Sequence, residues 1–109
     1  RYYLSAVGTA QGDVYVVGGF GVAATGAVAT FNESVLATVE KLDPATGVWT
    51  RKADLPQAAY GVGLGVFGCT TEDGGRCKLL AVGGYAAGGF TDAAFVFDTK
   101  MDEWTYAAP

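Results

Sequence analysis

The chain has 109 residues, of which half are hydrophobic and only 17% are charged, and this length suits one small domain rather than two sizeable cores. Seven Lys and Arg against eleven Asp and Glu give a formal charge of −4, which argues against nucleic acid or an acidic membrane surface as a partner. No continuous apolar stretch has the length of a bilayer span, and histidine, the commonest general base and neutral metal ligand, is absent.

Short strands are predicted along the whole chain. Apolar runs separated by turn residues, such as Gln11-Gly12, are typical of β-hairpins. Residues 34–42 also fit a capped helix when taken alone, but the second half has no such pattern, so only their end is predicted as a strand. The predicted strands cover residues 3–9, 13–17, 38–42, 48–52, 61–67, 78–82, 94–97 and 103–106.

The two halves of the chain carry copies of one pattern. Residues 14–20 (VYVVGGF) reappear as residues 79–85 (LLAVGGY). In both copies an Asp precedes a Trp by the same spacing, as Asp43 and Trp49 and as Asp98 and Trp104. The glycine pairs lie further apart than the tryptophans, so the two copies have loops of different length.

A glycine pair after an apolar strand, followed by a large apolar residue seven positions before a Trp, resembles the kelch repeat. That residue is Leu42 in the first copy and Phe97 in the second, where the family usually has Tyr. The resemblance covers essentially the whole chain. It implies an all-β fold of two four-stranded antiparallel kelch-type blades, residues 1–56 and 57–109, as part of a β-propeller.

Two blades are too few to close a propeller, which typically has about 4–8. Two apolar blade faces therefore need cover, and other propeller blades are expected as partners. Either the further blades belong to the same parent protein, or copies of a two-blade unit, natural or engineered, assemble into a ring by cyclic symmetry.

Structural roles are expected for the motif residues. Glycine is needed where neighbouring blades approach closely or where φ is positive. The tryptophans are expected to fill apolar space between blades, and their indole N–H groups need partners. Asp43 and Asp98 are expected to accept hydrogen bonds from turn amides. The structural residues are Gly18, Gly19, Trp49, Gly83, Gly84 and Trp104.

The resemblance implies a protein-interaction or scaffolding module that acts through loops on one face. These loops are residues 20–34 and 85–92, together with the linker 53–60. Their aromatic and polar residues suit a protein or peptide ligand, although a single aromatic side chain can equally cover a blade edge. The alternatives are a two-blade building block that self-assembles, and a non-catalytic segment of a larger kelch-like enzyme. The candidate partner-binding residues are Phe20, Phe31, Asn32, Tyr85, Phe90, Thr91 and Asp92.

Cys69 and Cys77 are the only cysteines, and they flank a Gly-Gly turn in an insertion of the second copy. A disulfide between them is predicted, with two free thiols as the alternative. The disulfide favours an oxidising or extracellular compartment, and nothing else in the sequence assigns a location. Without further ligands the two cysteines do not make a zinc site.

The remaining motifs predict no chemistry. Residues 63–68 (GLGVFG) match the dinucleotide fingerprint, but no helix follows them, so they are predicted as a glycine-rich inner strand. Asn32 begins a glycosylation sequon whose use stays open. The acidic pairs at 72–73 and 102–103 are predicted to be solvated turn residues. No catalytic residue, metal site or cofactor is predicted, and the chain is not expected to be an enzyme.

Overall fold

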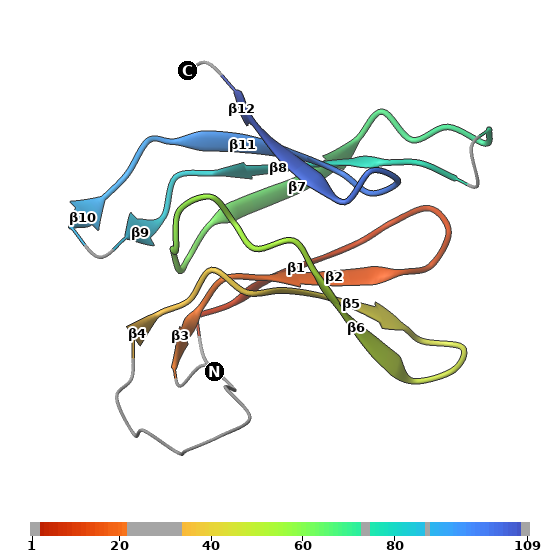
Figure 1. Cartoon of the computed structure of the whole chain (residues 1–109), viewed down its shortest axis with the longest axis horizontal. Coiled ribbons are helices and arrows are strands. Elements are labelled where there is room, and N and C mark those ends of the chain that lie inside the picture. Colours follow the sequence, from red (N-terminus) through yellow and green to blue (C-terminus); the bar gives the residue numbers. More distant parts are fainter. Residues whose placement is uncertain (1–2, 22–33, 73–74, 87, 108–109) are drawn as a thin grey trace.

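The computed structural model describes residues 3–21, 34–72, 75–86 and 88–107. These residues form only strands and turns, so they contain no helix that could cross a membrane. Two four-stranded antiparallel sheets stack on one another, and a two-stranded hairpin extends from each (Figure 1). The all-β prediction of two four-stranded antiparallel blades is confirmed.

The first sheet, called blade 1, has the strand order β1-β2-β5-β6. Turn residues set its hairpins, as where the Asp43 carboxylate accepts a hydrogen bond from the Ala45 amide at 3.0 Å. No helix forms between residues 34 and 42, because the short strand β4 pairs with β3 there and β5 joins the sheet. The strands are β1 (Ser5–Gly8), β2 (Val14–Val17), β3 (Phe20–Gly21), β4 (Ser34–Val35), β5 (Val39–Asp43) and β6 (Val48–Lys52).

The second sheet, called blade 2, has the strand order β7-β8-β11-β12 and repeats the topology of blade 1. The glycine-rich residues 63–68 supply its β7 strand, as predicted, and no helix follows them. The small hairpins β3–β4 and β9–β10 were not predicted. The strands are β7 (Gly63–Phe67), β8 (Lys78–Val82), β9 (Tyr85–Ala86), β10 (Gly89–Phe90), β11 (Ala94–Asp98) and β12 (Glu103–Ala107).

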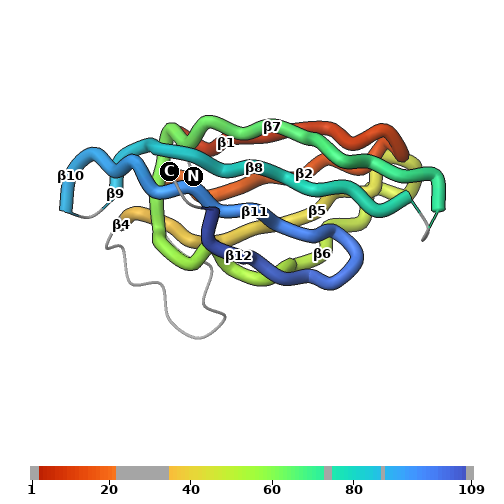
Figure 2. Tube along the Cα trace, turned by 90° about the horizontal axis from the view of Figure 1, so that it is seen from above, coloured from red at the N-terminus to blue at the C-terminus, as the bar shows by residue number. Residues whose placement is uncertain are grey.

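The core lies between the two blades, because each sheet turns alternate side chains toward the other. Figure 2 shows β1 beside β7 along one edge of the stack, with β6 and β12 toward the opposite edge. The linker between the blades closes the core at one end. The buried cluster comprises Tyr15, Val17 and Val39 from blade 1, Leu79, Ala81 and Phe97 from blade 2, Leu55 and Ala59 from the linker, and Val62 just before β7.

Two polar contacts lock blade 2 onto the linker that leaves blade 1. The Trp104 indole Nε1–H donates to the Ala53 carbonyl at 2.9 Å, and the Asp102 carboxylate accepts from the Ala53 amide at 2.9 Å. The Trp104 ring packs on Phe97, with ring centroids 4.9 Å apart. Asp102 was expected to be a solvated turn residue, and that expectation was wrong because its carboxylate binds across the interface between the blades.

Trp49, the equivalent residue of blade 1, lies on the outer face of that blade and is 56% exposed. It borders a groove of about 320 Å³ that Leu4, Val16 and Glu40 also line. The two tryptophans occupy the same strand position, but Trp104 faces the other blade and its linker, whereas Trp49 lies on an outer face. Among the described residues, a second blade lies beside Trp104 and none lies beside Trp49.

This difference gives a matched pair of variants. We expect Trp104→Phe to lower the free energy of unfolding by about 1–2 kcal/mol, because the Ala53 carbonyl loses its indole donor. Trp49→Phe is the control and should change it by less than about 0.5 kcal/mol. Urea unfolding of the two variants measures the difference, and equal losses would contradict the assignment.

Candidate functional site

The glycine pairs place the β3 and β9 hairpins at one end of the molecule, together with the linker (Figure 1). Gly18 and Gly84 both have positive φ and lie against main-chain carbonyls of the linker. A Cβ on Gly84 would lie 2.7 Å from the Tyr60 carbonyl, so only glycine allows this approach. The Tyr60 and Tyr85 main chains then exchange hydrogen bonds of 2.9 and 3.0 Å.

Five aromatic rings from separate segments meet at this end, and we call them the aromatic surface. Tyr60 is its centre, with ring centroids 5.5 Å from Tyr3, 5.7 Å from Phe20 and 5.1 Å from Tyr85. Phe90 packs edge-on against Tyr85 at 5.2 Å. Such ring pairs add about 0.5–1.5 kcal/mol each beyond the area that they bury. The rings therefore support one another as a connected surface.

An open groove of about 440 Å³ runs over the aromatic surface. None of its lining side chains is charged, and Thr91 supplies the polar side chain apart from the tyrosine hydroxyls. Phe90 is 91% exposed, the highest value among the large hydrophobic side chains of the described residues. The groove is lined by Tyr3, Tyr60, Gly61, Gly84, Tyr85, Phe90 and Thr91.

The candidate partner-binding residues divide into three groups. Phe20, Tyr85 and Phe90 belong to the aromatic surface. Thr91 lies beside them with its hydroxyl 3.3 Å from the Gln57 side-chain oxygen, and Asp92 is exposed in the following loop. Phe31 and Asn32 lie outside the described residues.

Tyr3 and Tyr60 were not among the candidate residues, because Tyr3 begins the strand predicted at residues 3–9, and Tyr60 was included only as the last residue of the linker 53–60 on the predicted binding face. The repeat could have placed both tyrosines at the binding end, because it makes the start of β1 equivalent to the start of β7. Gly61 N–H donates to the Tyr3 carbonyl at 3.0 Å, so the chain entering β1 lies against the chain entering β7. Aromatic residues at the starts of inner strands are therefore brought to the same end as the loops after the glycine pairs.

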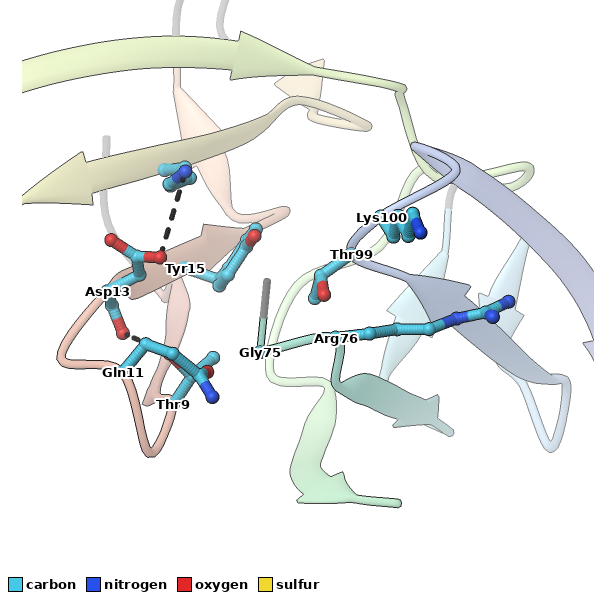
Figure 3. Close-up of a pocket in the computed structure, with 9 residues that line it drawn as sticks. Thr9, Gln11, Asp13, Tyr15, Gly75, Arg76, Thr99 and Lys100 are labelled. Carbon is cyan, nitrogen blue, oxygen red and sulfur yellow. Dashed lines mark hydrogen bonds and ion pairs between the residues drawn. The ribbon is translucent and has the colours of Figure 1, made fainter. Parts of the chain in front are cut away.

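The opposite end of the interface between the blades holds a smaller polar pocket of about 140 Å³ (Figure 3). Lys41 and Asp13 form an ion pair of 3.7 Å on the blade 1 side, and Arg76 and Lys100 line the blade 2 side. Burial, together with the charges of Asp13 and Asp102, raises the pKa of the Tyr15 hydroxyl to about 12. The hydroxyl therefore stays protonated at neutral pH.

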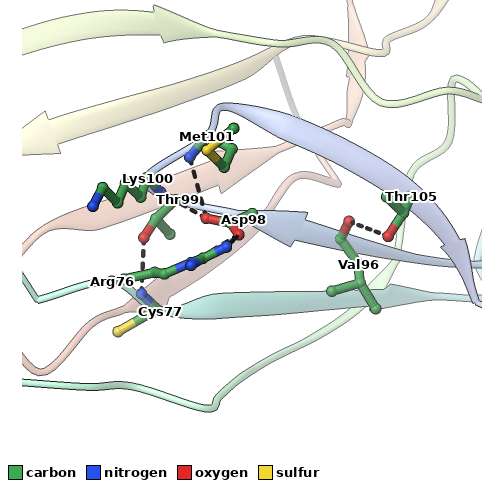
Figure 4. A network of polar contacts seen from close by, with 8 residues as sticks. All are labelled: Arg76, Cys77, Val96, Asp98, Thr99, Lys100, Met101 and Thr105. Atoms are coloured by element: carbon green, nitrogen blue, oxygen red, sulfur yellow. Dashed lines mark hydrogen bonds and ion pairs between the residues drawn. The ribbon is translucent and has the colours of Figure 1, made fainter. Parts of the chain in front are cut away.

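A polar network fastens the insertion of the second copy to blade 2 (Figure 4). Cys69 and Cys77 form the predicted disulfide. The Arg76 guanidinium binds the Asp98 carboxylate, and the Thr99 hydroxyl accepts from the Cys77 amide at 2.9 Å. Hydrogen bonds from Arg76, and then from main-chain amides, lower the pKa of Asp98 to about 2, although burial opposes this shift.

Within the part of the chain that the structure describes, no three His, Cys, Asp or Glu side chains gather as metal ligands would. Three charged side chains that line the polar pocket are in ion pairs, Lys41 with Asp13 and Arg76 with Asp98. These groups brace the ends of the blades.

Two stacked four-stranded blades with matching glycine pairs and tryptophans define a repeat protein of the β-propeller class. A family model described as the Kelch motif matches residues 1–56 and 75–109, and the chain therefore belongs to the kelch family. A search of curated proteins found no match. Kelch repeat domains are generally non-catalytic protein-interaction modules. The expected boundary between residues 56 and 57 stays a prediction.

The Asp98 carboxylate predicts a defined acid response. Because its folded pKa is about 2 and its ordinary value is 3.8, its stabilising contribution is complete above about pH 4 and is lost as the pH falls toward 2. We expect Asp98→Asn to be less stable at neutral pH and to lack this part of the acid loss. Unfolding free energies of both proteins between pH 5 and 2 test this, and parallel curves would contradict it.

The disulfide gives a second prediction, because it closes a short loop. The chain-entropy relation for a sequence separation of 8 gives a stabilisation of at most about 2–3 kcal/mol. Reduction should therefore lower the free energy of unfolding by no more than this amount and leave the aromatic surface at the other end intact. Denaturant unfolding with and without reductant, followed by tyrosine ring resonances, makes the measurement. Loss of the whole fold on reduction would be the contrary result.

Proposed function

We propose that the chain is a protein-interaction module that binds a protein or peptide segment on its aromatic surface. The observation that carries the proposal is the joining of five aromatic rings, four of which line an uncharged groove of about 440 Å³. The loop residues proposed from the sequence take part in it through Phe20, Tyr85 and Phe90.

The exposure of Phe90 supports a binding role over a packing role. A phenylalanine that only covered a blade edge would bury most of its ring, whereas Phe90 is 91% exposed and touches Tyr85 by its edge. Aromatic side chains that project from a rigid support are typical anchors of protein interfaces. Exposed apolar surface of this kind favours a partner that covers it.

The support under the rings is stiff, which favours tight binding. Main-chain hydrogen bonds hold Tyr60 to Tyr85 on both sides, and the Thr91 amide donates to the Gly84 carbonyl at 3.1 Å. A surface that is already ordered loses little conformational entropy when a partner binds. The anchors are therefore presented in a fixed arrangement.

The chemistry of the groove indicates the kind of partner. Its lining lacks the basic side chains that nucleic acid requires, and the whole chain carries a charge of −4. Apolar side chains of a protein or peptide match the rings, while tyrosine hydroxyls and Thr91 offer hydrogen bonds to its main chain. Catalysis is not part of the proposal, and the blades serve as the scaffold.

Selection of random peptides on the folded chain tests the proposal. We expect selected peptides to bind Phe90→Ala at least about tenfold more weakly than wild type, because the exposed anchor is lost. Phe67→Ala is the matched control, since Phe67 is also exposed, at 45%, but lies on β7 of blade 2, outside the aromatic surface. Unfolding measurements on both variants exclude a loss of fold.

Peptides that bind Phe90→Ala and wild type equally would contradict the proposal. Peptides that lose binding only to Phe67→Ala would place the interaction on the outer face of blade 2 instead.

A further inference from the structure

The polar pocket between the blades gathers basic side chains in a chain that is acidic as a whole. Three of the seven Lys and Arg residues, Lys41, Arg76 and Lys100, line its volume of about 140 Å³, and Asp13 is the one acidic side chain among the described lining residues. The Asp98 carboxylate, which binds Arg76, adds a second negative charge beside the pocket. These side chains therefore leave a surplus of one positive charge, although the chain carries −4.

The Tyr15 hydroxyl is a polar group of this pocket that the described residues leave without a partner. The Tyr15 side chain is only 2% exposed, and its ring packs edge-on against Phe97. Its hydroxyl is directed toward the space between the lining residues of the two blades (Figure 3), and no hydrogen-bond partner for it lies in the described part of the chain. With a pKa of about 12 it is protonated at neutral pH. A buried donor of this kind favours a ligand that supplies an acceptor.

Further hydrogen-bond donors line both sides of the pocket. Lys41 lies 3.7 Å from the Asp13 carboxylate, which is an ion pair without a direct hydrogen bond, so its ammonium group can still donate to a ligand. The Thr99 hydroxyl oxygen accepts from the Cys77 amide at 2.9 Å, and its O–H remains a donor. Donors from blade 1 and blade 2 therefore face the same small volume.

The walls of the pocket limit the size of its occupant. A Cβ on Gly75 would collide with the Gln11 side chain, so the insertion of blade 2 lies directly against the first hairpin turn of blade 1. A cavity of about 150 Å³ holds roughly one benzene ring, which has about six non-hydrogen atoms. The pocket of about 140 Å³ therefore suits a ligand of about four to six non-hydrogen atoms.

We propose that this pocket binds a small free carboxylate anion, such as a short hydroxy acid. The carboxylate accepts hydrogen bonds from the Tyr15 and Thr99 hydroxyls, and the basic side chains of both blades balance its charge. Its single charge matches the surplus in the pocket better than the roughly 1.5–2 negative charges that a phosphate group carries at neutral pH. The proposal is independent of the proposed function, because the pocket lies at the opposite end from the aromatic surface.

Binding of glycolate to the purified chain, followed by nuclear magnetic resonance shifts of the Thr99 and Lys100 amides, tests the proposal. Glycolamide is an uncharged counterpart with the same number of non-hydrogen atoms. We expect the wild-type chain to bind glycolate at least about tenfold more tightly than glycolamide, because hydrogen bonds to a charged acceptor are about twice as strong as neutral ones.

A pair of tyrosine variants locates the binding site. Tyr15→Phe removes the hydroxyl and keeps the ring that packs on Phe97, and it should weaken glycolate binding at least about tenfold because a hydrogen bond to a charged group is lost. Tyr106→Phe is the matched control, since Tyr106 is 72% exposed on β12, outside the pocket, and should bind glycolate as the wild type does. Unfolding measurements on both variants exclude a loss of fold.

Equal binding of glycolate and glycolamide would overturn the proposal, because the charge of the ligand would then play no part. So would glycolate binding that Tyr15→Phe leaves unchanged. A tripeptide that ends in glycine carries the same carboxylate on a longer chain. Tighter binding of this peptide than of glycolate would overturn the assignment to a free acid and point to the C-terminus of a protein.

Discussion

The two blades depend on one contact, in which Trp104 and Asp102 of blade 2 bind the carbonyl and the amide of the same linker residue, Ala53. This contact fixes the linker across the end of the core, where Leu55 and Ala59 then bury their side chains. The linker in turn supplies the carbonyls against which Gly18 and Gly84 lie. The arrangement of the aromatic surface thus follows from the way in which one blade holds the chain that leaves the other.

The interface between the blades has two chemically different ends, and the difference separates support from recognition. At one end ion pairs and a disulfide brace the turns, and the Tyr15 hydroxyl is buried beside charged groups. At the other end an uncharged aromatic groove opens to solvent. The braced end therefore stabilises the fold, while the aromatic end presents its rings to a partner, as expected where loops carry function on a stable scaffold.

The sequence predicted the eight main strands and the disulfide, because apolar runs and turn residues are local signals. Local signals are not sufficient for residues 34–42. These residues fit a helix when taken alone, but in the structure they contain β4 and β5, because pairing with other strands outweighs the local helical pattern. The sequence did not predict the roles of Asp102 and Tyr60, because both depend on where one blade meets the other. It predicted an interface position for both tryptophans, and the described part of the chain places a blade beside Trp104 but not beside Trp49.

The central claim is that one interface between the blades is complete and that the face bearing Trp49 is open. Hydrogen exchange of the two indole N–H groups, read in one nuclear magnetic resonance spectrum of the purified chain, tests it most directly. The account predicts slow exchange for Trp104, which donates to Ala53 at 2.9 Å, and fast exchange for Trp49. Fast exchange at both indoles would contradict the blade contact, and slow exchange at both would contradict the open face.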